Sequence, residues 1–101
     1  MTTFQEKVYQ FLRTIPKGKV VTYTDLAITI GRKKAVRAVG NALHHNPDMV
    51  IVPCHRVVRS DGSVGGYAGG IEKKISLLRK EGVIVENGQV DLVRYRWVRY
   101  T

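Results

Sequence analysis

The chain has a single thiol, and it stands in the segment Pro53-Cys54-His55-Arg56. A thiolate is a nucleophile, a neighbouring imidazole can accept the thiol proton, and a nearby cation favours the anionic form. Because consecutive side chains of a strand point to opposite faces, Cys54 and His55 can cooperate only if the chain turns there or a water joins them. The alternative is a buried cysteine that packs as a small hydrophobe, next to a histidine satisfied by a carbonyl.

Two further features could complete a nucleophilic centre. Glu81 is expected near the end of a helix, where a carboxylate is electrostatically unfavourable, so a hydrogen bond to His55 would explain its position. Otherwise Glu81 is an exposed surface acid. The loop from Gly65 to Gly70 is rich in glycine, which lets a backbone approach a ligand closely,. It lacks the lysine and hydroxyl residue of a phosphate-binding loop, and the alternative is a flexible hairpin end.

The charge balance indicates a polyanionic partner. The 101 residues include 17 Lys and Arg against 8 Asp and Glu, a formal net charge of +9 at pH 7. Nucleic acid and an anionic membrane surface are the two candidates. No apolar run is long enough to span a bilayer, and no helical segment combines a basic with an aromatic face, so the pattern disfavours a membrane role. The single cysteine excludes an internal disulfide and a Cys-pair zinc site, and the N-terminus has no secretory signal. We therefore expect a cytoplasmic, nucleoid-associated protein with one domain over residues 1–101.

The sequence pattern of the first half of the chain predicts three helices. Apolar residues from Phe4 to Ile15 recur at helical spacing and end before Pro16,. Thr22 and Asp25 can cap a short second helix that stops at Gly31. A third helix follows, with an inner face of Val36, Val39 and Leu43 and an outer face of Arg37, Asn41 and His44. A short helix, a tight turn and an amphipathic basic helix form the helix-turn-helix pattern.

The second half has fewer helical signals. We expect a buried stretch over 49–52, a small hairpin over 57–64 and a helix over 71–81,. Asn87-Gly88 between two β-branched runs predicts a second hairpin, and the tail over 94–97 alternates like an edge strand or an extended end. The predicted fold is therefore mainly α with a small β component, and is like a winged helix.

These segments together resemble the O6-alkylguanine-DNA alkyltransferases. The five residues from Pro53 to Val57 match the active-site signature of that family, and 21–27 resembles the segment ahead of its first DNA-binding helix. Residues 38–42 with Asn46-Pro47 are similar to its recognition helix and the following turn. Residues 64–70 are similar to its substrate-pocket loop, and 77–82 to the helix that closes the site. Order and spacing fit over nearly the whole chain.

The resemblance implies a role for each matching position. Cys54 would take the alkyl group, His55 would be the base through a water, and Glu81 would hold the imidazole. Asn46 would brace the turn that carries Cys54. Tyr23 would contact the phosphate of the flipped nucleotide and hydrogen-bond the leaving guanine. The pocket would be lined by Tyr67, by Ala68 and Gly69, by the carbonyls of Cys54 and Val57, and by Met49, where some relatives have proline.

For DNA, the resemblance implies that Arg37 enters the base stack where the lesion leaves it. Lys34, Ala35, Ala38 and Asn41 would be the other DNA contacts of the recognition helix. The implied partner is duplex DNA that contains O6-alkylguanine, bound by a monomer without cofactor or metal. The location would be nuclear if the source were eukaryotic. Family members usually carry a further N-terminal domain, which we expect to be absent here.

Three functions are compatible with these features. The first is single-turnover DNA repair, in which Cys54 irreversibly accepts the alkyl group from a flipped base. The second is a non-enzymatic, alkyltransferase-like protein that binds the lesion for another pathway. Such proteins are also short but replace the cysteine, so Cys54 favours the enzyme. The third is a helix-turn-helix regulator, which would need neither the thiol nor the Tyr67 loop.

Overall fold

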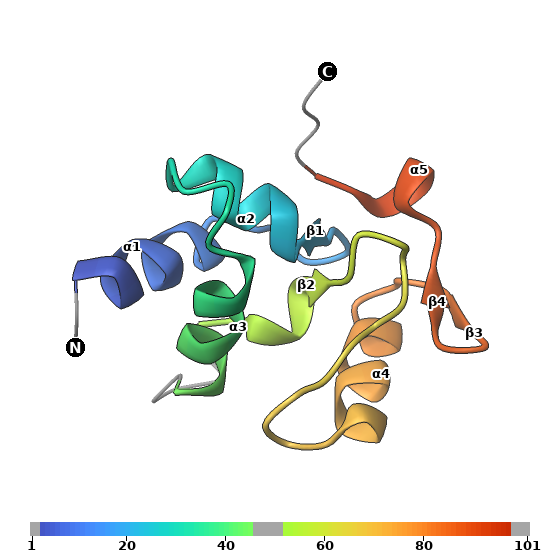
Figure 1. Cartoon of the computed structure of the whole chain (residues 1–101). Helices are drawn as coiled ribbons and strands as arrows, with labels where there is room; N and C mark the ends of the chain where they lie inside the picture. The colour runs from blue at the N-terminus through green and yellow to red at the C-terminus, as the bar shows by residue number, and fades with distance from the viewer. Residues whose placement is uncertain (1–2, 46–51, 98–101) are drawn as a thin grey trace.

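The computed structural model describes residues 3–45 and 52–97, and within them it is mostly helical. Its elements, shown in Figure 1, are α1 (Thr3–Leu12), β1 (Val21–Thr22), α2 (Tyr23–Thr29), α3 (Val36–His44), the 3-10 turn η1 (Cys54–Arg56), β2 (Val57–Val58), α4 (Ile71–Lys80), β3 (Val85–Glu86), β4 (Gln89–Val90) and α5 (Leu92–Tyr95). The fold is mainly α with a small β component and contains a helix-turn-helix, as predicted. No helix among the described residues is long and apolar enough to cross a membrane.

The helix-turn-helix consists of α2 and α3, which pack on each other, and α3 also packs on α1. The predicted cap of α2 is present, because the Thr22 hydroxyl accepts a hydrogen bond from the Asp25 amide and the Asp25 carboxylate accepts one from the Thr22 amide, both at 3.0 Å. Gly31 follows α2 with a φ of +80°, in the left-handed region, where any residue with a side chain would be strained,. Tyr9 donates a hydrogen bond to the Ala42 carbonyl at 2.7 Å and so fixes α3 against α1.

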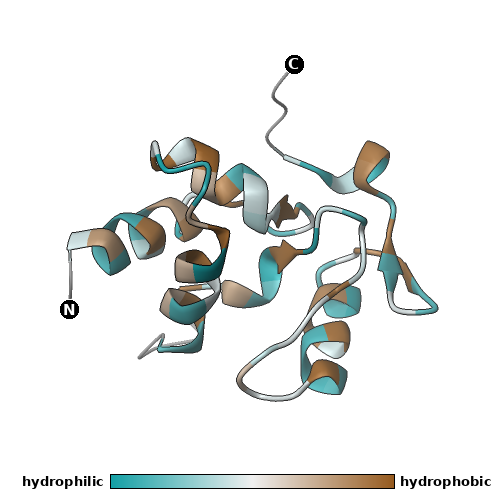
Figure 2. Cartoon of the chain, in the orientation of Figure 1, coloured by the Kyte–Doolittle hydropathy of each residue, from teal (hydrophilic) through white to brown (hydrophobic). Residues whose placement is uncertain are grey.

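Two buried clusters lie on either side of the small parallel sheet β1–β2. Val21 and Val57 belong to the cluster of α1, α2 and α3, whereas Val20 and Val58 belong to the cluster of α4 and the C-terminal hairpin. This division follows from the strand period of two, which sends neighbouring side chains to opposite faces. In Figure 2 apolar and polar residues alternate along the helices accordingly. The chain leaves the first cluster and enters the second at η1 and β2.

Three sequence expectations are wrong in detail. The 57–64 segment makes a tight turn, in which the Arg59 amide donates a hydrogen bond to the Ser63 carbonyl at 2.8 Å. The segment does not form an antiparallel strand pair, because β2 pairs in parallel with β1 instead. The tail is extended only at its end: Arg94 and Tyr95 belong to the short helix α5, whose Val93 amide is capped by the Asp91 carboxylate. Arg96 then pairs in parallel with Val20. Val36 is 37% exposed on α3 and does not belong to its inner face.

The C-terminal segment is tied back to the helix-turn-helix by an ion pair. Asp25 is fully buried, and the Arg96 guanidinium donates hydrogen bonds to both of its carboxylate oxygens. The same carboxylate caps α2. A buried carboxylate is stable only when its lone pairs are satisfied, so Arg96 supports the start of α2 from a distant part of the chain.

Candidate active site and nucleic-acid surface

Cys54 lies on a turn, as cooperation with His55 requires. Pro53 precedes η1, the Cys54 amide bonds the Val52 carbonyl at 2.8 Å, and the Arg56 amide bonds the Pro53 carbonyl at 3.1 Å. In a 3-10 turn successive side chains are about 120° apart, not on opposite faces. Cys54 is a buried thiol with 4% exposure. The turn therefore lets the thiol and the imidazole share one side of the backbone.

His55 and Glu81 are in direct contact, as the predicted pairing requires. The Nε2 atom of His55 lies 3.0 Å from Oε2 of Glu81, although its N–H does not point along a good hydrogen bond. The other ring nitrogen, Nδ1, is buried without a hydrogen-bond partner among the described residues. Burial lowers the pKa of His55, and the attraction of Glu81 does not cancel this effect. The imidazole is therefore neutral at pH 7 and can accept a proton.

Arg56 is directed to Glu81, contrary to the expectation that its charge favours the thiolate. Its guanidinium donates two hydrogen bonds to the Glu81 carboxylate, at 2.9 and 2.6 Å, and a third to the Ile15 carbonyl at 2.7 Å. Burial alone would raise the pKa of Glu81, but the hydrogen bonds from Arg56 and the adjacent His55 imidazole reverse the shift and hold the pKa below its ordinary value. Glu81 is thus an anion at neutral pH whose negative charge Arg56 offsets.

A hollow of about 90 Å³ brings several predicted site residues together. It is lined by Cys54 and by α2, α3 and the glycine-rich loop, through Tyr23, Gly40, Leu43, His44, Gly66, Tyr67 and Ala68. A Cβ at Gly69 would lie 2.9 Å from the Tyr67 ring, so glycine is required for the ring to fold back on the loop. The side chain of Val57 lies in the core beside the turn. Asn46 and Met49 lie outside the described residues.

Tyr23 is the first residue of α2, and its ring forms one wall of this hollow. Burial raises the pKa of Tyr23, and this outweighs the lowering by Arg59. The hydroxyl is therefore protonated at neutral pH and can donate a hydrogen bond. Gly65, with φ of +72°, comes close to the same hydroxyl, since a Cβ there would lie 3.4 Å from it.

Sequence reasoning missed Lys74, which is completely buried. Its ammonium donates a hydrogen bond to the Gly66 carbonyl at 3.1 Å and lies 5.8 Å from the centre of the Tyr23 ring. Burial lowers its pKa to about 8, partly opposed by attraction to Cys54. A signal was available, because Lys74 is four residues before the inward-facing Leu78 and so lies on the same face of α4.

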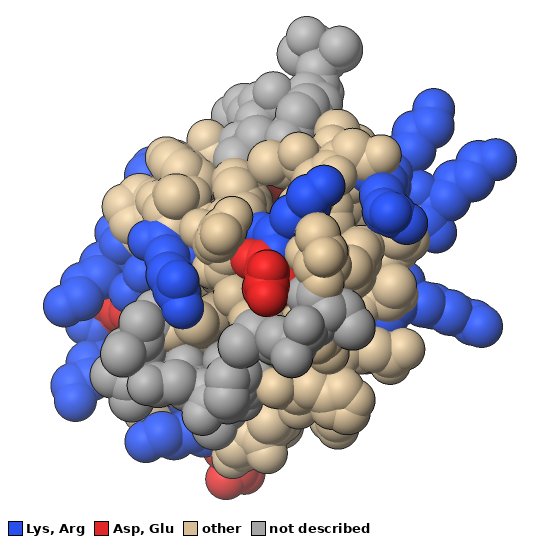
Figure 3. Space-filling model, turned by 90° about the vertical axis from the view of Figure 1, so that its left-hand side faces the viewer, with Lys and Arg blue, Asp and Glu red and all other residues tan. Residues whose placement is uncertain are grey.

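The exposed face of α3 passes over the hollow. Arg37, Ala38 and Asn41 are exposed, whereas Gly40 and His44, about one and two turns after Arg37, line the hollow,. Residues three and four apart share a helix face, so Arg37 lies near the mouth of the hollow. Lys34 is exposed and Ala35 half-buried at the start of the helix. On the face seen in Figure 3, Lys and Arg side chains project around the edge and acidic side chains are few.

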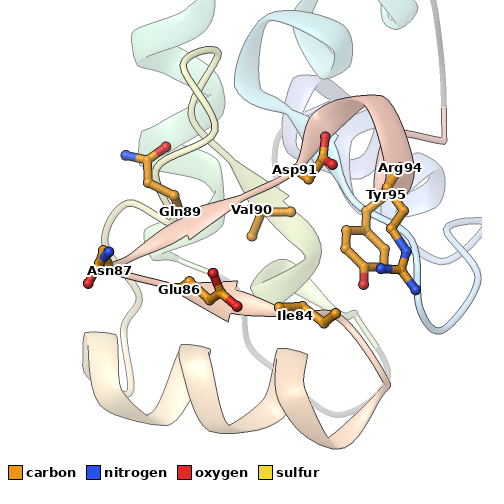
Figure 4. A pocket seen from close by; sticks show the side chains of 8 residues that line it. All are labelled: Ile84, Glu86, Asn87, Gln89, Val90, Asp91, Arg94 and Tyr95. Carbon is orange, nitrogen blue, oxygen red and sulfur yellow. The ribbon is translucent and has the colours of Figure 1, made fainter.

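A second, larger hollow of about 450 Å³ lies on the β3–β4 hairpin and α5 (Figure 4). Its lining contains no cysteine or histidine, so it offers no nucleophile with a base beside it. Among the described residues, no group of three or more His, Cys, Asp or Glu side chains could hold a metal ion. The smaller hollow at Cys54 is therefore the candidate active site.

Residues 3–83 match the family model described as 6-O-methylguanine DNA methyltransferase, DNA binding domain. The chain is 49% identical over 90 residues to a bifunctional methyltransferase/endonuclease of Picrophilus torridus, covering 89% of this chain and 30% of that protein. It is 50% identical over 84 residues to the methylated-DNA–protein-cysteine methyltransferase of Salmonella typhimurium, covering 83% and 49%. The chain thus spans half or less of these relatives.

The comparison with solved structures agrees with the sequence comparison. A Mycobacterium tuberculosis OGT in complex with DNA aligns with a TM-score of 0.79 and 48% identity, over 81% of this chain and 50% of that one. S. pombe Atl1, in complex with damaged DNA containing O6-carboxymethylguanine, aligns with a TM-score of 0.88 and 33% identity over 98% of both chains. The chain therefore belongs to the 6-O-methylguanine DNA methyltransferase family, through the DNA-binding domain of that family.

Proposed function

We propose that this chain repairs DNA by moving the alkyl group of an O6-alkylguanine in duplex DNA to Cys54, in one irreversible turnover. The observation that carries the proposal is the position of Cys54 in a hollow with Tyr23 and Tyr67, next to the His55–Glu81 pair. Relatives named methylated-DNA–protein-cysteine methyltransferase support it. We also propose that residues 1–101 act as a single domain and a monomer.

The damaged base must leave the duplex before a buried thiol can reach it. We assign α3 to the DNA groove, where Arg37 enters the gap that the flipped base leaves, and Lys34, Ala35, Ala38 and Asn41 contact the DNA. Tyr23 contacts the phosphate of the flipped nucleotide. The net charge of +9 supports binding that depends mainly on phosphates, so the affinity should fall steeply with salt,.

The transfer itself needs a thiolate and a neutralised leaving group. The Cys54 proton passes to Nδ1 of His55 through a water, and Glu81 stabilises the imidazolium that forms. The sulfur attacks the alkyl carbon, the S–C bond forms as the C–O6 bond breaks, and the electron pair stays on the guanine oxygen. The Tyr23 hydroxyl hydrogen-bonds the departing guanine. In the balanced reaction the thiol proton ends on guanine and the protein keeps a thioether, without a cofactor or metal.

The remaining pocket residues position the base. The loop of Tyr67, Ala68 and Gly69 encloses it, with the Ala68 amide near the guanine oxygen, and the carbonyls of Cys54 and Val57 accept from the guanine amino group. Asn46 braces the turn before Cys54, and Met49 lies near bulky alkyl groups. These assignments rest on the family pattern, and the shared hollow supports those for Cys54, Tyr67 and Ala68.

A second candidate function is lesion binding without transfer. It is favoured by the alignment with S. pombe Atl1, which has a TM-score of 0.88 and covers 98% of both chains. Cys54 argues against it, because a lesion binder has no need of a thiol beside a base.

One experiment separates the two functions. The chain is mixed with a duplex that contains one O6-methylguanine, and its intact mass is measured, with Cys54→Ser and an undamaged duplex as controls. We expect a gain of one methyl group in the unaltered chain only. An unchanged mass together with lesion-selective binding would replace transfer by the lesion-binding function.

A further inference from the structure

Lys74 is a buried cation that the proposed transfer does not use. It is the fourth residue of α4, and its neighbours Glu72 and Lys73 are exposed while Lys74 is not. An ammonium group withdrawn from water is costly unless an anion or several acceptors compensate it. The one hydrogen bond to the Gly66 carbonyl, at 3.1 Å, is partial compensation.

No carboxylate in residues 3–45 or 52–97 forms an ion pair with Lys74. Glu81, the acid of the site, is bound by Arg56 and His55 instead. Tyr23 contributes its ring face, which attracts a cation, 5.8 Å from the Lys74 nitrogen,. The ammonium group of Lys74 therefore lies among weak acceptors, and a nearby anion would stabilise its charge.

Cys54 is the group that can become that anion. The two side chains are electrostatically coupled, and the Gly66 carbonyl that Lys74 binds belongs to the wall of the hollow that contains Cys54. Most other titratable groups around the sulfur and the ammonium carry no unpaired charge. Tyr9, Tyr23 and Tyr67 are neutral because burial raises their pKa, His55 is neutral, and Arg56 is paired with Glu81. His44 and Arg59 are exposed, so water screens Arg59, although its charge still lowers the pKa of Lys74,.

We propose that Lys74 is a positioning residue whose buried positive charge holds the Cys54 sulfur as a thiolate, while its hydrogen bond fixes the Gly66 edge of the pocket. The role rests on the proposed function, because it concerns the sulfur that receives the alkyl group. His55 accepts the proton that leaves Cys54, whereas Lys74 keeps its own protons and stabilises the charge left behind. The cationic role that was first expected of Arg56 therefore belongs to Lys74, eighteen positions further along the chain.

Thiol reactivity without DNA tests the role directly. Iodoacetamide alkylates a thiolate, forming an S–C bond as iodide leaves, and the rate constant is followed from about pH 5 to pH 10 by intact mass. In Lys74→Met, which keeps the length of the side chain but loses the charge, we expect the midpoint of the profile to rise by about one pH unit or more. The rate at pH 7 should fall about tenfold. A Lys74→Met profile that superimposes on the unaltered one, in a folded variant, would overturn the proposal.

Two variants control for charge and packing. Lys73→Met removes the same charge from an exposed neighbour on α4 and should leave the profile unchanged. Lys74→Arg restores the charge and should return the midpoint towards that of the unaltered chain. Equal shifts in Lys74→Arg and Lys74→Met would show that packing, not charge, is responsible, and so would overturn the proposal.

A measurement on the unaltered chain keeps the test independent of folding in the variants. The ultraviolet absorbance of the thiolate should reach half its amplitude below about pH 8.5, the midpoint of an unperturbed cysteine. A midpoint at or above that pH would refute the role. Iodoacetamide needs no lesion, so a failed Lys74 test leaves methyl transfer intact, and failed methyl transfer leaves the Lys74 result standing.

Discussion

Glu81→Gln removes a negative charge on which two other side chains depend. Arg56 donates two hydrogen bonds to this carboxylate, at 2.9 and 2.6 Å, and His55 lies 3.0 Å from it. The Glu81 and Arg56 side chains are only 13% and 11% exposed, so the variant leaves a poorly solvated guanidinium. Breaking a buried ion pair costs about 3–5 kcal/mol. Because Arg56 keeps its bond to the Ile15 carbonyl and Gln keeps one acceptor, we expect the lower end, about 3 kcal/mol,.

Urea unfolding at pH 7, followed by far-ultraviolet circular dichroism, measures this loss. The slope against urea should stay the same, since the variant exposes no additional surface on unfolding. Glu86→Gln is the matched control, because Glu86 is exposed in β3, and its stability should change by less than about 0.5 kcal/mol,. A loss below about 1 kcal/mol for Glu81→Gln, typical of surface pairs, would refute the buried-pair reasoning.

The same variant reports on the chemistry. With the carboxylate gone, the imidazolium that forms during proton transfer is no longer stabilised, and we expect methyl transfer to slow about a hundredfold. The single-turnover rate is measured at a temperature where urea titration shows the variant folded. An unchanged rate would limit Glu81 to a structural role.

Three further outcomes follow from the site. Tyr23→Phe should slow single-turnover transfer about a hundredfold with the same unfolding midpoint, because a donor to the leaving guanine is lost, and an equal rate would remove Tyr23 from the mechanism. Arg37→Ala should reduce repair of an O6-methylguanine duplex by at least about tenfold. This loss of repair should exceed the loss of DNA affinity that a binding titration measures for Cys54→Ser, and unimpaired repair in Arg37→Ala would exclude the intercalating role. Because burial lowers the pKa of His55 from its ordinary value of 6.5, the acid limb of a pH–rate profile, where the protonated imidazole cannot act as a base, should have its midpoint below pH 6.5,. A midpoint at or above pH 6.5 would contradict this.

Local signals predicted most of the elements correctly. Thr22 and Asp25 lie three residues apart and form the expected cap of α2, and Asn87-Gly88 forms the expected turn between β3 and β4. The prediction of a 57–64 hairpin was wrong because strand pairing is not local. Val57 pairs with Val21, thirty-six positions earlier, and the buried parallel pair replaces the short antiparallel one,.

For the candidate site, the sequence by itself determined the chemical types and the local motif: one thiol followed by an imidazole, a carboxylate at the end of a helix, and a glycine-rich loop. Only the tertiary structure decided which charged side chain interacts with which group of the site. Arg56 is next to His55 in sequence, yet it binds Glu81, while Lys74 lies buried beside the pocket. The physical reason is that a motif depends only on neighbours along the chain. Burial and pairing of charged side chains depend instead on which face of α4 packs against η1, because that packing sets the free energy of each buried charge,.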